Sequence, residues 1–386
     1  MKIGIAKERR AHELRVAVTP DTVKKFIGLG AEVAIEAGAG LGSSYTDEAY
    51  TAAGAKVVAD EAAAISDADI VLKVQRPLST VEGGPDELAL LKRGAMLVGI
   101  LAPYGAKEQL AQYAQRGVNA FAMEFMPRIT RAQTMDVLSS QANLAGYRAV
   151  IDAAAAFGHA FPMMMTAAGT VAPARVFVMG AGVAGLQAIA TARRLGAIVS
   201  GTDVRPAAKE QVTSLGATFV AVEDEEFKQA ETTAGYAKPM SAEYQKKQAA
   251  LVAEHIKKQD VVVTTALIPG RPAPVLVSEE MVASMKHGSV IVDLAVEQGG
   301  NCPLSEPGKV VVKHGVTLIG HLNMPSRIAV DASALYARNL LSFLTPLIDK
   351  ESKALKINWD DEIIKGTALT RDGQVVHPAF AGAGGA

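Results

Sequence analysis

A short polar stretch between two apolar flanks, residues 128–139, holds the side chains best suited to chemistry. The stretch contains Arg128, Gln133, Asp136 and Ser139. An amide and a hydroxyl can hydrogen-bond a carboxamide, whereas an arginine and a carboxylate can pair and respond to a ring that changes its charge. By themselves, these residue types slightly favour a plainer interpretation: a loop between domains with Thr134 or Asp136 as a helix cap.

A glycine-rich turn predicts a dinucleotide-binding site. Gly180, Gly182 and Gly185 follow an apolar strand-like run and open a helical segment, and Asp203 ends the next strand-like run. The glycines permit a tight turn and close approach to a pyrophosphate, which the helix N-terminus attracts. A carboxylate at Asp203 suits ribose hydroxyls and repels a 2′-phosphate, which favours NAD(H) over NADP(H).

Two features beside this motif have plainer alternatives. Arg205 is interpreted as a solvated charge at the end of its strand rather than as a phosphate-binding residue. Ala266 and Leu267 end another strand at the same sheet edge, where they can pack on adenine and ribose. A capped strand end explains Ala266 and Leu267 equally well.

The elements around these motifs predict an α/β protein. In this chain of 386 residues, strand-like runs alternate with helical segments over the first 125 residues and again from Arg175. We expect two doubly wound Rossmann-like domains with parallel sheets, joined by long helices, with a cleft between them. Domain 1 is expected to be discontinuous, over 1–137 and 327–386, and domain 2, over 138–326, is expected to bind NAD(H).

Within this plan, some segments have specific interpretations. A helix is expected to start at Thr19 and Pro20, and a long helix over 326–350. The aperiodic segment between Glu223 and Lys258 predicts a long surface loop. The apolar runs 153–174 and 176–192 contain Pro, His or Gly, so we interpret them as buried helix and strand rather than as membrane spans.

Composition excludes several classes of function. The formal net charge is -1 and 20% of residues are charged, which gives no support to a nucleic-acid partner. The single cysteine, Cys302, excludes a disulfide framework, and the seven scattered histidines give no metal-ligand spacing, so no metal is expected. The charged start of the chain does not fit an export signal.

Several stretches resemble the NAD(H)-binding alpha subunit of proton-translocating NAD(P) transhydrogenase, a member of the alanine dehydrogenase/transhydrogenase superfamily. They are "MKIGIAKERR", "RVAVTP", "LKVQRP", "SSQANLAGYRAV", "GAGVAGLQAIATARRLGA", "TTALIPGRPAPVLV" and "GSVIVDLAVEQGGNCPLSEPG". The similarity runs from residue 1 to the tail and is greatest to the separate, soluble form of that subunit.

The resemblance implies a function and partners. In that family, hydride passes directly from NADH on this subunit to NADP⁺ on a partner, with Si/Re specificity. The transfer is coupled to proton translocation through a membrane component. The subunit forms a homodimer and associates with an NADP(H)-binding beta subunit and a membrane-spanning proton channel. It is thus cytoplasmic and peripheral on the cytoplasmic face of the inner membrane.

The resemblance also implies a site. It places Arg128, Gln133, Asp136 and Ser139 around the nicotinamide. It adds Tyr236 as a further catalytic candidate, with Gly235, on a loop "AGYAKPM" that closes on the nucleotide, and Gln248 in the helix that follows. The neighbours of these motifs complete the cofactor-binding set with Arg205, Ala266 and Leu267: Ile129, Thr130, Thr134, Met135, Val183, Ala184 and Val204.

Alanine dehydrogenase is the alternative function. Its substrate residues resemble Arg15 and Lys73, and its acidic residue appears here as Glu297, but "ILAPYGA" lacks the histidine that follows the strand in that family. Amino-acid oxidation needs an acid/base group, whereas hydride transfer between two nicotinamides needs two rings held in place. Arg15 and Lys73 are therefore interpreted as structural remnants or ion-pair partners. A non-catalytic NAD-binding module is a third possibility, which the polar set at 128–139 disfavours.

Overall fold

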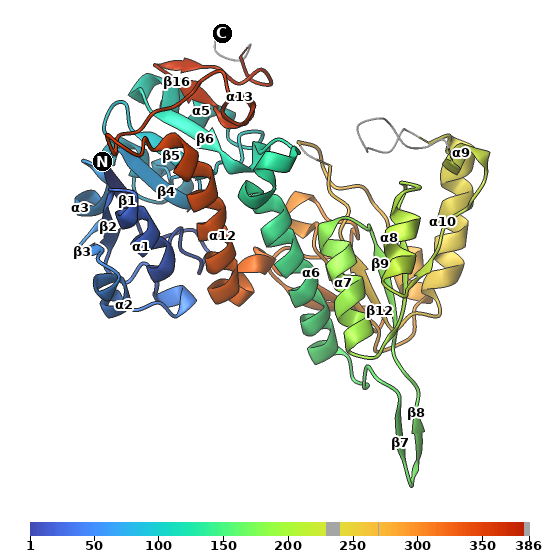
Figure 1. Ribbon diagram of the computed structural model, residues 1–386. Helices are drawn as coiled ribbons and strands as arrows, with labels where there is room; N and C mark the ends of the chain where they lie inside the picture. Colours follow the sequence, from blue (N-terminus) through green and yellow to red (C-terminus); the bar gives the residue numbers. More distant parts are fainter. Residues whose placement is uncertain (229–239, 269, 382–386) are drawn as a thin grey trace. The chain divides into compact units, whose positions relative to one another are not determined.

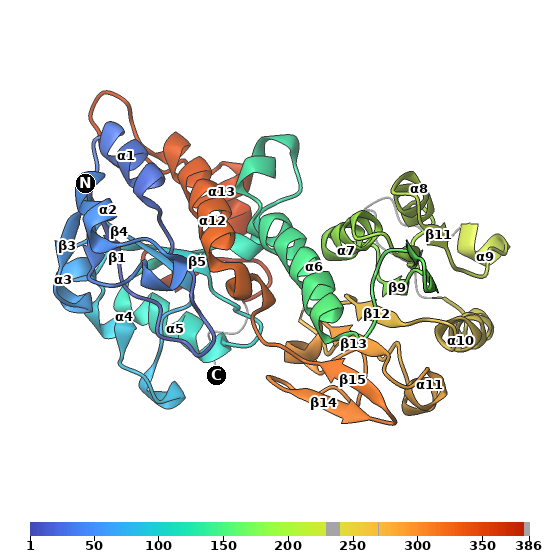
Figure 2. The same cartoon turned by 90° about the horizontal axis from the view of Figure 1, so that it is seen from below.

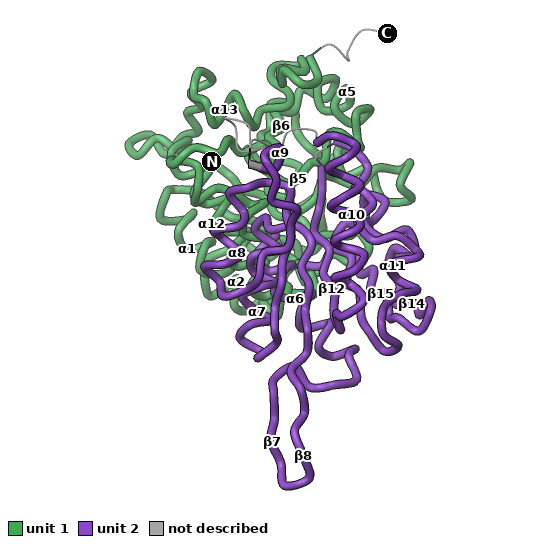
Figure 3. Tube along the Cα trace, turned by 90° about the vertical axis from the view of Figure 1, so that its right-hand side faces the viewer, with its two compact units in different colours: residues 1–141, 325–386 green, residues 142–324 purple. Residues whose placement is uncertain are grey.

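The computed structural model describes residues 1–228, 240–268 and 270–381, and the chain divides into two compact units (Figure 3). Unit 1 comprises 1–141 and 325–386, and unit 2 comprises 142–324. The first unit thus ends at residue 141, where 137 is expected from the sequence, and resumes at 325, where 327 is expected.

Unit 1 is built on a parallel sheet with the strand order β3-β2-β1-β4-β5-β6 (Figure 1). Its strands are β1 (Lys2–Ile5), β2 (Glu32–Glu36), β3 (Lys56–Val58), β4 (Ile70–Gln75), β5 (Met96–Ile100) and β6 (Asn119–Ala122). Only β3 has no counterpart among the strands that the sequence predicts. The strand order reverses between β1 and β4, and ligands of such sheets bind at the carboxyl edge beside that switch point.

Helices cover both faces of this sheet. They are α1 (Pro20–Gly28), α2 (Asp47–Ala52), α3 (Glu61–Ile65), α4 (Glu87–Leu90), α5 (Lys107–Arg116), α12 (Ala329–Leu344) and α13 (Glu362–Thr367). The predicted start of α1 is confirmed: Thr19 and Thr22 form a capping box around Pro20. The predicted helix over 326–350 is shorter than expected, because 3₁₀ turns that contain Pro325 and Pro346 flank α12.

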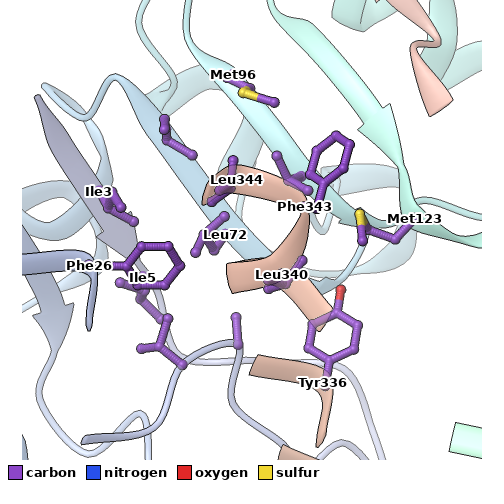
Figure 4. Packing of buried hydrophobic residues seen from close by; sticks show 14 of the residues in the cluster. Ile3, Ile5, Phe26, Leu72, Met96, Met123, Tyr336, Leu340, Phe343 and Leu344 are labelled. Carbon is purple, nitrogen blue, oxygen red and sulfur yellow. The ribbon is translucent and has the colours of Figure 1, made fainter. Parts of the chain in front are cut away.

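The largest core of unit 1 forms where α12 packs on the sheet (Figure 4). Tyr336, Leu340, Phe343 and Leu344 of α12 are all 1% exposed or less. They share one cluster with Ile3, Ile5, Phe26, Leu72, Met96 and Met123. Burial on this scale makes α12 a rigid element of unit 1.

Unit 2 has a seven-stranded sheet with the order β11-β10-β9-β12-β13-β15-β14. The strands are β9 (Arg175–Met179), β10 (Ile198–Thr202), β11 (Thr218–Phe219), β12 (Val261–Thr264), β13 (Val290–Asp293), β14 (Val310–Lys313) and β15 (Val316–Ile319). All neighbours are parallel except β14 and β15, an antiparallel pair turned at His314 and Gly315. The predicted α/β, Rossmann-like class with parallel sheets is confirmed.

Helices cover both faces of this sheet as well (Figure 2). They are α6 (Val137–Ala156), which starts in unit 1, α7 (Val183–Arg194), α8 (Ala208–Ser214), α9 (Glu225–Lys228), α10 (Ala242–Ile256) and α11 (Glu279–Ser284). Residues of α6, α7 and α8 share one cluster, and residues of α10 and α11 share another.

Two expectations within unit 2 are wrong. The segment between Glu223 and Lys258 is not one long loop, because α9 and α10 occupy much of its described part. In α10, Tyr244, Val252 and Ile256 form a buried stripe at helical spacing.

The other correction concerns the apolar run 153–174, which is not a buried helix and strand. After α6 it forms an exposed hairpin of β7 (Met164–Thr166) and β8 (Gly169–Val171) that projects from the rest of unit 2 (Figure 1). Over the described residues, no helix has the length and apolar character needed to cross a membrane.

Candidate functional site

The glycine turn lies at the carboxyl edge of the unit 2 sheet, between β9 and α7. Gly180 has a φ of 104°, and a Cβ there would lie 2.4 Å from the Thr265 hydroxyl oxygen. A Cβ on Gly185 would lie 1.7 Å from the Gly180 carbonyl oxygen. These two positions therefore require glycine, for the turn and for close packing of helix on strand.

The N-terminus of α7 is open. Gly182 is its N-cap, makes no side-chain cap hydrogen bond, and has open space where a Cβ would be. The amides of the first turn, over Val183, Ala184 and Gly185, thus have the arrangement that binds phosphate oxygens at a helix N-terminus. The residues present therefore fit a dinucleotide pyrophosphate.

Gly146 supports this turn, and sequence reasoning did not single it out. It lies in α6, where an added Cβ would be 2.0 Å from the Ala184 carbonyl oxygen. The backbone of α6 therefore packs directly on the first turn of α7. An isolated glycine inside a helical pattern is the only sequence signal for this contact.

Asp203 follows β10 and faces the turn. Its Oδ2 accepts a hydrogen bond of 2.7 Å from the Ala181 amide, and Arg205 donates to both carboxylate oxygens at 2.9 Å. Burial raises the pKa of the Asp203 carboxyl, but these hydrogen bonds and the charge of Arg205 outweigh burial and hold it below its usual value. Arg205 is therefore not the solvated charge expected from the sequence. Val204, between them, is 51% exposed.

A buried amide shapes the segment after β12. Asn301, 0% exposed, accepts from the Ala266 amide at 3.0 Å and donates to the Ala266 carbonyl at 2.9 Å. Leu267 is 47% exposed beside it. Because β12 neighbours β9 in the sheet, Ala266 and the glycine turn lie at the same switch point. Asn301 is a second residue that sequence reasoning missed, since its sequence neighbourhood suggests only a turn.

Two other candidates from the polar region have different outcomes. Gln248 of α10 is half-buried, donates to Thr202 Oγ1 at 3.2 Å and accepts from the Val222 amide at 2.8 Å. It therefore ties α10 to the end of β10. Gly235 and Tyr236 lie outside the described residues.

The polar stretch 128–139 belongs to unit 1, and its backbone turns the polar residues outward. It contains the 3₁₀ segment η4 (Thr130–Met135), in which Ala132 and Met135 are buried. The exposed residues are Arg128, Thr130, Gln133 and Thr134, and Ile129 is partly buried. The arrangement presents an amide, a hydroxyl and a cation on one short segment.

Asp136 caps the helix that follows this segment, as one of the sequence interpretations predicts. Its Oδ1 accepts from the Ser139 amide at 2.9 Å, and its Oδ2 accepts from the Ser139 hydroxyl. Asp136 and Ser139 are therefore already paired with each other, and the helix starts where they meet.

Arg15 and Lys73 are buried at the carboxyl edge of the unit 1 sheet, and both are ion-paired. Arg15 Nη2 lies 2.7 Å from Glu13 Oε2, and Lys73 Nζ lies 2.8 Å from Glu87 Oε2. A third carboxylate, Glu8, lies 3.5 Å from Lys73 Nζ. The prediction that these cations form ion pairs is confirmed.

Comparison with known proteins agrees with this geometry. The family model "Alanine dehydrogenase/PNT, N-terminal domain" matches residues 4–145, and "Alanine dehydrogenase/PNT, C-terminal domain" matches 149–378. The first of the separate alpha-subunit chains of NAD(P) transhydrogenase from Rhodospirillum rubrum is 62% identical over 384 residues, with 100% of each chain covered.

Solved structures give the same assignment. A transhydrogenase structure from Sinorhizobium meliloti superposes with a TM-score of 0.88 at 57% identity, covering 97% of this chain and 100% of that one. An L-alanine dehydrogenase structure has a TM-score of 0.81 at 27% identity, covering 98% of each chain. The chain therefore belongs to the alanine dehydrogenase/PNT family, a class of two-unit α/β oxidoreductases. Within it, the chain belongs to the NAD-binding alpha subunits of transhydrogenase.

Proposed function

We propose that this chain holds NAD(H) and takes part in direct hydride transfer with NADP(H) on a partner subunit. The observation that carries the proposal is the open N-terminus of α7, where Gly182 leaves first-turn amides facing a space without side chains. When bound, the nicotinamide ring of NAD(H) supplies or accepts the hydride. The name of the Rhodospirillum rubrum relative supports the pairing with NADP(H).

Asp203 gives the chain a preference for NAD(H) in this proposal. Its pKa is lowered, so the carboxylate is ionised at neutral pH and repels a 2′-phosphate. Arg205 occupies both carboxylate oxygens and therefore has to share them with, or yield them to, the ribose hydroxyls. Val204 and Gln248 border the same end of β10.

The roles of the polar stretch follow from its exposed residues. Gln133 orients the carboxamide, Arg128 and Asp136 respond to the charge of the ring, and Ser139 completes the hydrogen bonding. A ring presented to another polypeptide needs one open face, so its orientation has to come from side chains around it. Tyr236, Gly235 and the exposed Leu267 are the remaining proposed contacts of the nucleotide.

The experiment mixes the purified chain with the NADP(H)-binding component of a transhydrogenase. We expect single-turnover hydride transfer from NADH to an NADP analogue. Gln133→Ala should slow this transfer by on the order of 10²-fold while changing the NADH dissociation constant little, because misplacing a ring by about 1 Å costs that much. NADH binding without any transfer by the unaltered chain would identify a non-catalytic module instead.

Cofactor choice needs a separate titration. We expect NADH fluorescence to report tighter binding than NADPH, and Asp203→Asn to narrow the ratio by about tenfold, the effect of removing one charge contact. Asp203→Asn keeps an oxygen for the Ala181 amide, so the fold is retained. Equal affinities of the unaltered chain for NADH and NADPH would contradict the assignment.

Alanine dehydrogenase activity is the second candidate, because an L-alanine dehydrogenase shares the fold. The ion pairs of Arg15 and Lys73 argue against it, since both cations are engaged by buried carboxylates. The segment after β5, residues 101–106, contains no histidine to serve as acid or base. Turnover of alanine and NAD⁺ by the purified chain would favour this alternative.

The partners proposed are a second copy of this chain, an NADP(H)-binding beta subunit and a membrane-spanning proton channel, to which the chain is peripheral on the cytoplasmic side. The β7–β8 hairpin supports the homodimer. Met163, Met164 and Met165 are 59%, 44% and 78% exposed, and a lone two-stranded hairpin is marginally stable in water. Light scattering should report a dimer, and Met165→Asp should weaken it.

A further inference from the structure

A series of buried hydrogen bonds lies beneath the polar stretch, and Asn339 of α12 is at its centre. The Asn339 Nδ2 donates to the Thr134 carbonyl at 2.8 Å, and its Oδ1 accepts from the Ser140 hydroxyl at 2.7 Å. Thr134 lies in η4 and Ser140 in the first turn of α6, on opposite sides of Asp136. One side chain therefore joins the two segments that carry the proposed nicotinamide contacts.

The series continues from Ser140 to the sheet edge. Gln141 Nε2 donates to the Ser140 hydroxyl oxygen at 3.2 Å, and Gln141 Oε1 accepts from Arg15 Nη1 at 2.8 Å. Arg15 in turn donates to Glu13, which also accepts from Gln75 at the end of β4 at 2.6 Å. The outward-facing stretch is thus connected, bond by bond, to the rigid sheet of unit 1.

The location of Asn339 explains why this connection is stiff. Asn339 is 7% exposed, and Tyr336, Leu340 and Phe343 hold α12 in the core. A buried amide is costly unless both its donor and its acceptor find partners, and hydrogen bonds in such a setting are strong. The two hydrogen bonds of Asn339 satisfy it and constrain Thr134 and Ser140 at the same time.

A second tether of the same stretch offers a contrast. Arg131 of η4 forms a bidentate ion pair with Asp361, at 2.6 and 3.0 Å. The Arg131 side chain is 54% exposed and that of Asp361 is 24% exposed. Solvent screens such a pair, which contributes little to holding a backbone in place.

We propose that Asn339 is a positioning residue for hydride transfer, and that Arg15 is the far anchor of the same hydrogen-bonded series. The inference rests on the proposed function. It gives Arg15 a task in this chain that differs from substrate binding: it fixes Gln141, and through Ser140 and Asn339 it fixes the backbone that presents Gln133. None of these groups has to touch the nucleotide.

The test compares Asn339→Leu with Asp361→Asn. Leucine has a similar volume and removes both hydrogen bonds, whereas Asp361→Asn removes the exposed tether and keeps an oxygen to cap α13. For Asn339→Leu we expect the single-turnover transfer rate to fall at least about tenfold, because small displacements of a reacting ring are costly. The NADH dissociation constant should stay within about twofold, and amide hydrogen exchange over 130–136 should become faster.

For Asp361→Asn, the rate and the exchange should both stay within about twofold. If Asn339→Leu does not fold, Ser140→Ala, which deletes one hydroxyl, takes its place with the same pattern and a smaller effect. An unchanged rate, an affinity that falls in proportion to the rate, or an equal slowing by Asp361→Asn would overturn the proposal. If the unaltered chain transfers no hydride, the proposed function fails, while unchanged exchange in the variant refutes the tether by itself.

Discussion

The two sheets have the same strand order around their switch points, yet only one has a dinucleotide cradle. In unit 2, three residues separate β9 from α7, and they include Gly180 and Gly182. In unit 1, fourteen residues separate β1 from α1. A long connection moves the helix N-terminus away from the strand end, so no amides converge there. Topology therefore supplies an edge, and the first turn decides whether that edge can bind a phosphate.

Electrostatics separates the two edges as well. In unit 1, Lys73 lies among the buried carboxylates of Glu8 and Glu87. Burial raises the pKa of Glu8, and the attraction of the carboxylates outweighs burial to raise the pKa of Lys73. The edge of unit 1 thus neutralises itself, whereas the edge of unit 2 leaves helix amides for a ligand.

The largest expected effect comes from breaking the unit 1 edge. Lys73→Met should lower the free energy of unfolding of unit 1 by about 3–5 kcal/mol, because it leaves Glu8 and Glu87 buried without their cation. Hydrogen exchange in β4 and β5 measures this loss. NADH binding, which the proposed function assigns to the glycine turn of unit 2, should be unchanged wherever the variant is folded.

Lys92→Met is the matched control, since Lys92 pairs with Asp69 with both side chains about 40% exposed, 39% and 43%. Its cost should be roughly 0–1 kcal/mol. If Lys73→Met also costs less than about 1 kcal/mol, the unit 1 edge does not owe its structure to this ion cluster.

A smaller effect should follow from filling the unit 2 edge. Gly185→Ala places a methyl group 1.7 Å from the Gly180 carbonyl oxygen, so strand and helix must separate. We expect a loss of roughly 1–3 kcal/mol in the stability of unit 2. Exchange in β9 and β10 would report it.

Gly182→Ala serves as the control, because its methyl group meets open space. It should leave the fold intact and weaken only NADH binding, which it obstructs directly. Equal stability losses from Gly182→Ala and Gly185→Ala would show that the turn is not packed as described.

The sequence predicted the cradle well because its signal is local. Strand, glycines, helix and Asp203 occur in order over a short span, and each has one physical explanation. The capping role of Asp136 was predictable for the same reason. The hairpin of β7 and β8 was not, because three successive methionines are apolar and an apolar run suggests burial.

Residues that act over long sequence separations escaped the sequence. Asn301 contacts Ala266 from 35 positions away, and Asn339 contacts Thr134 from 205 positions away. A polar residue inside a helical pattern shows only that something pairs with it, and the partner depends on the tertiary fold. The α10 helix escaped because only its buried stripe is apolar.

The pH dependence of stability should sharpen the comparison by the smallest amount. Glu124 follows β6, in the 3₁₀ turn η3 (Met123–Phe125), and accepts from the Leu101 and Ala102 amides at 3.0 and 2.6 Å. Burial raises the pKa of Glu124 to about 7, although those amides lower it. Burial likewise raises the pKa of Glu61, also in unit 1, to about 7. In unit 2, the pKa of Asp203 is shifted in the opposite direction.

The two shifts have opposite consequences. Folded unit 1 binds the Glu124 proton more tightly than the unfolded chain, so its stability should fall as pH rises from about 4.5 to about 7 and level off above, by on the order of 1–3 kcal/mol. The stabilisation from Asp203 is present above its unfolded pKa and is lost only as pH falls below about 4. Exchange measured from pH 5 to pH 8, corrected for intrinsic rates, should therefore show declining protection in β5 and β6 but constant protection in β9 and β10. Glu124→Gln, which keeps an oxygen for both amides, should remove part of the decline and leave the share of Glu61. A decline of the same size in this variant would mean that Glu124 is ionised throughout the range and that its amide contacts outweigh its burial.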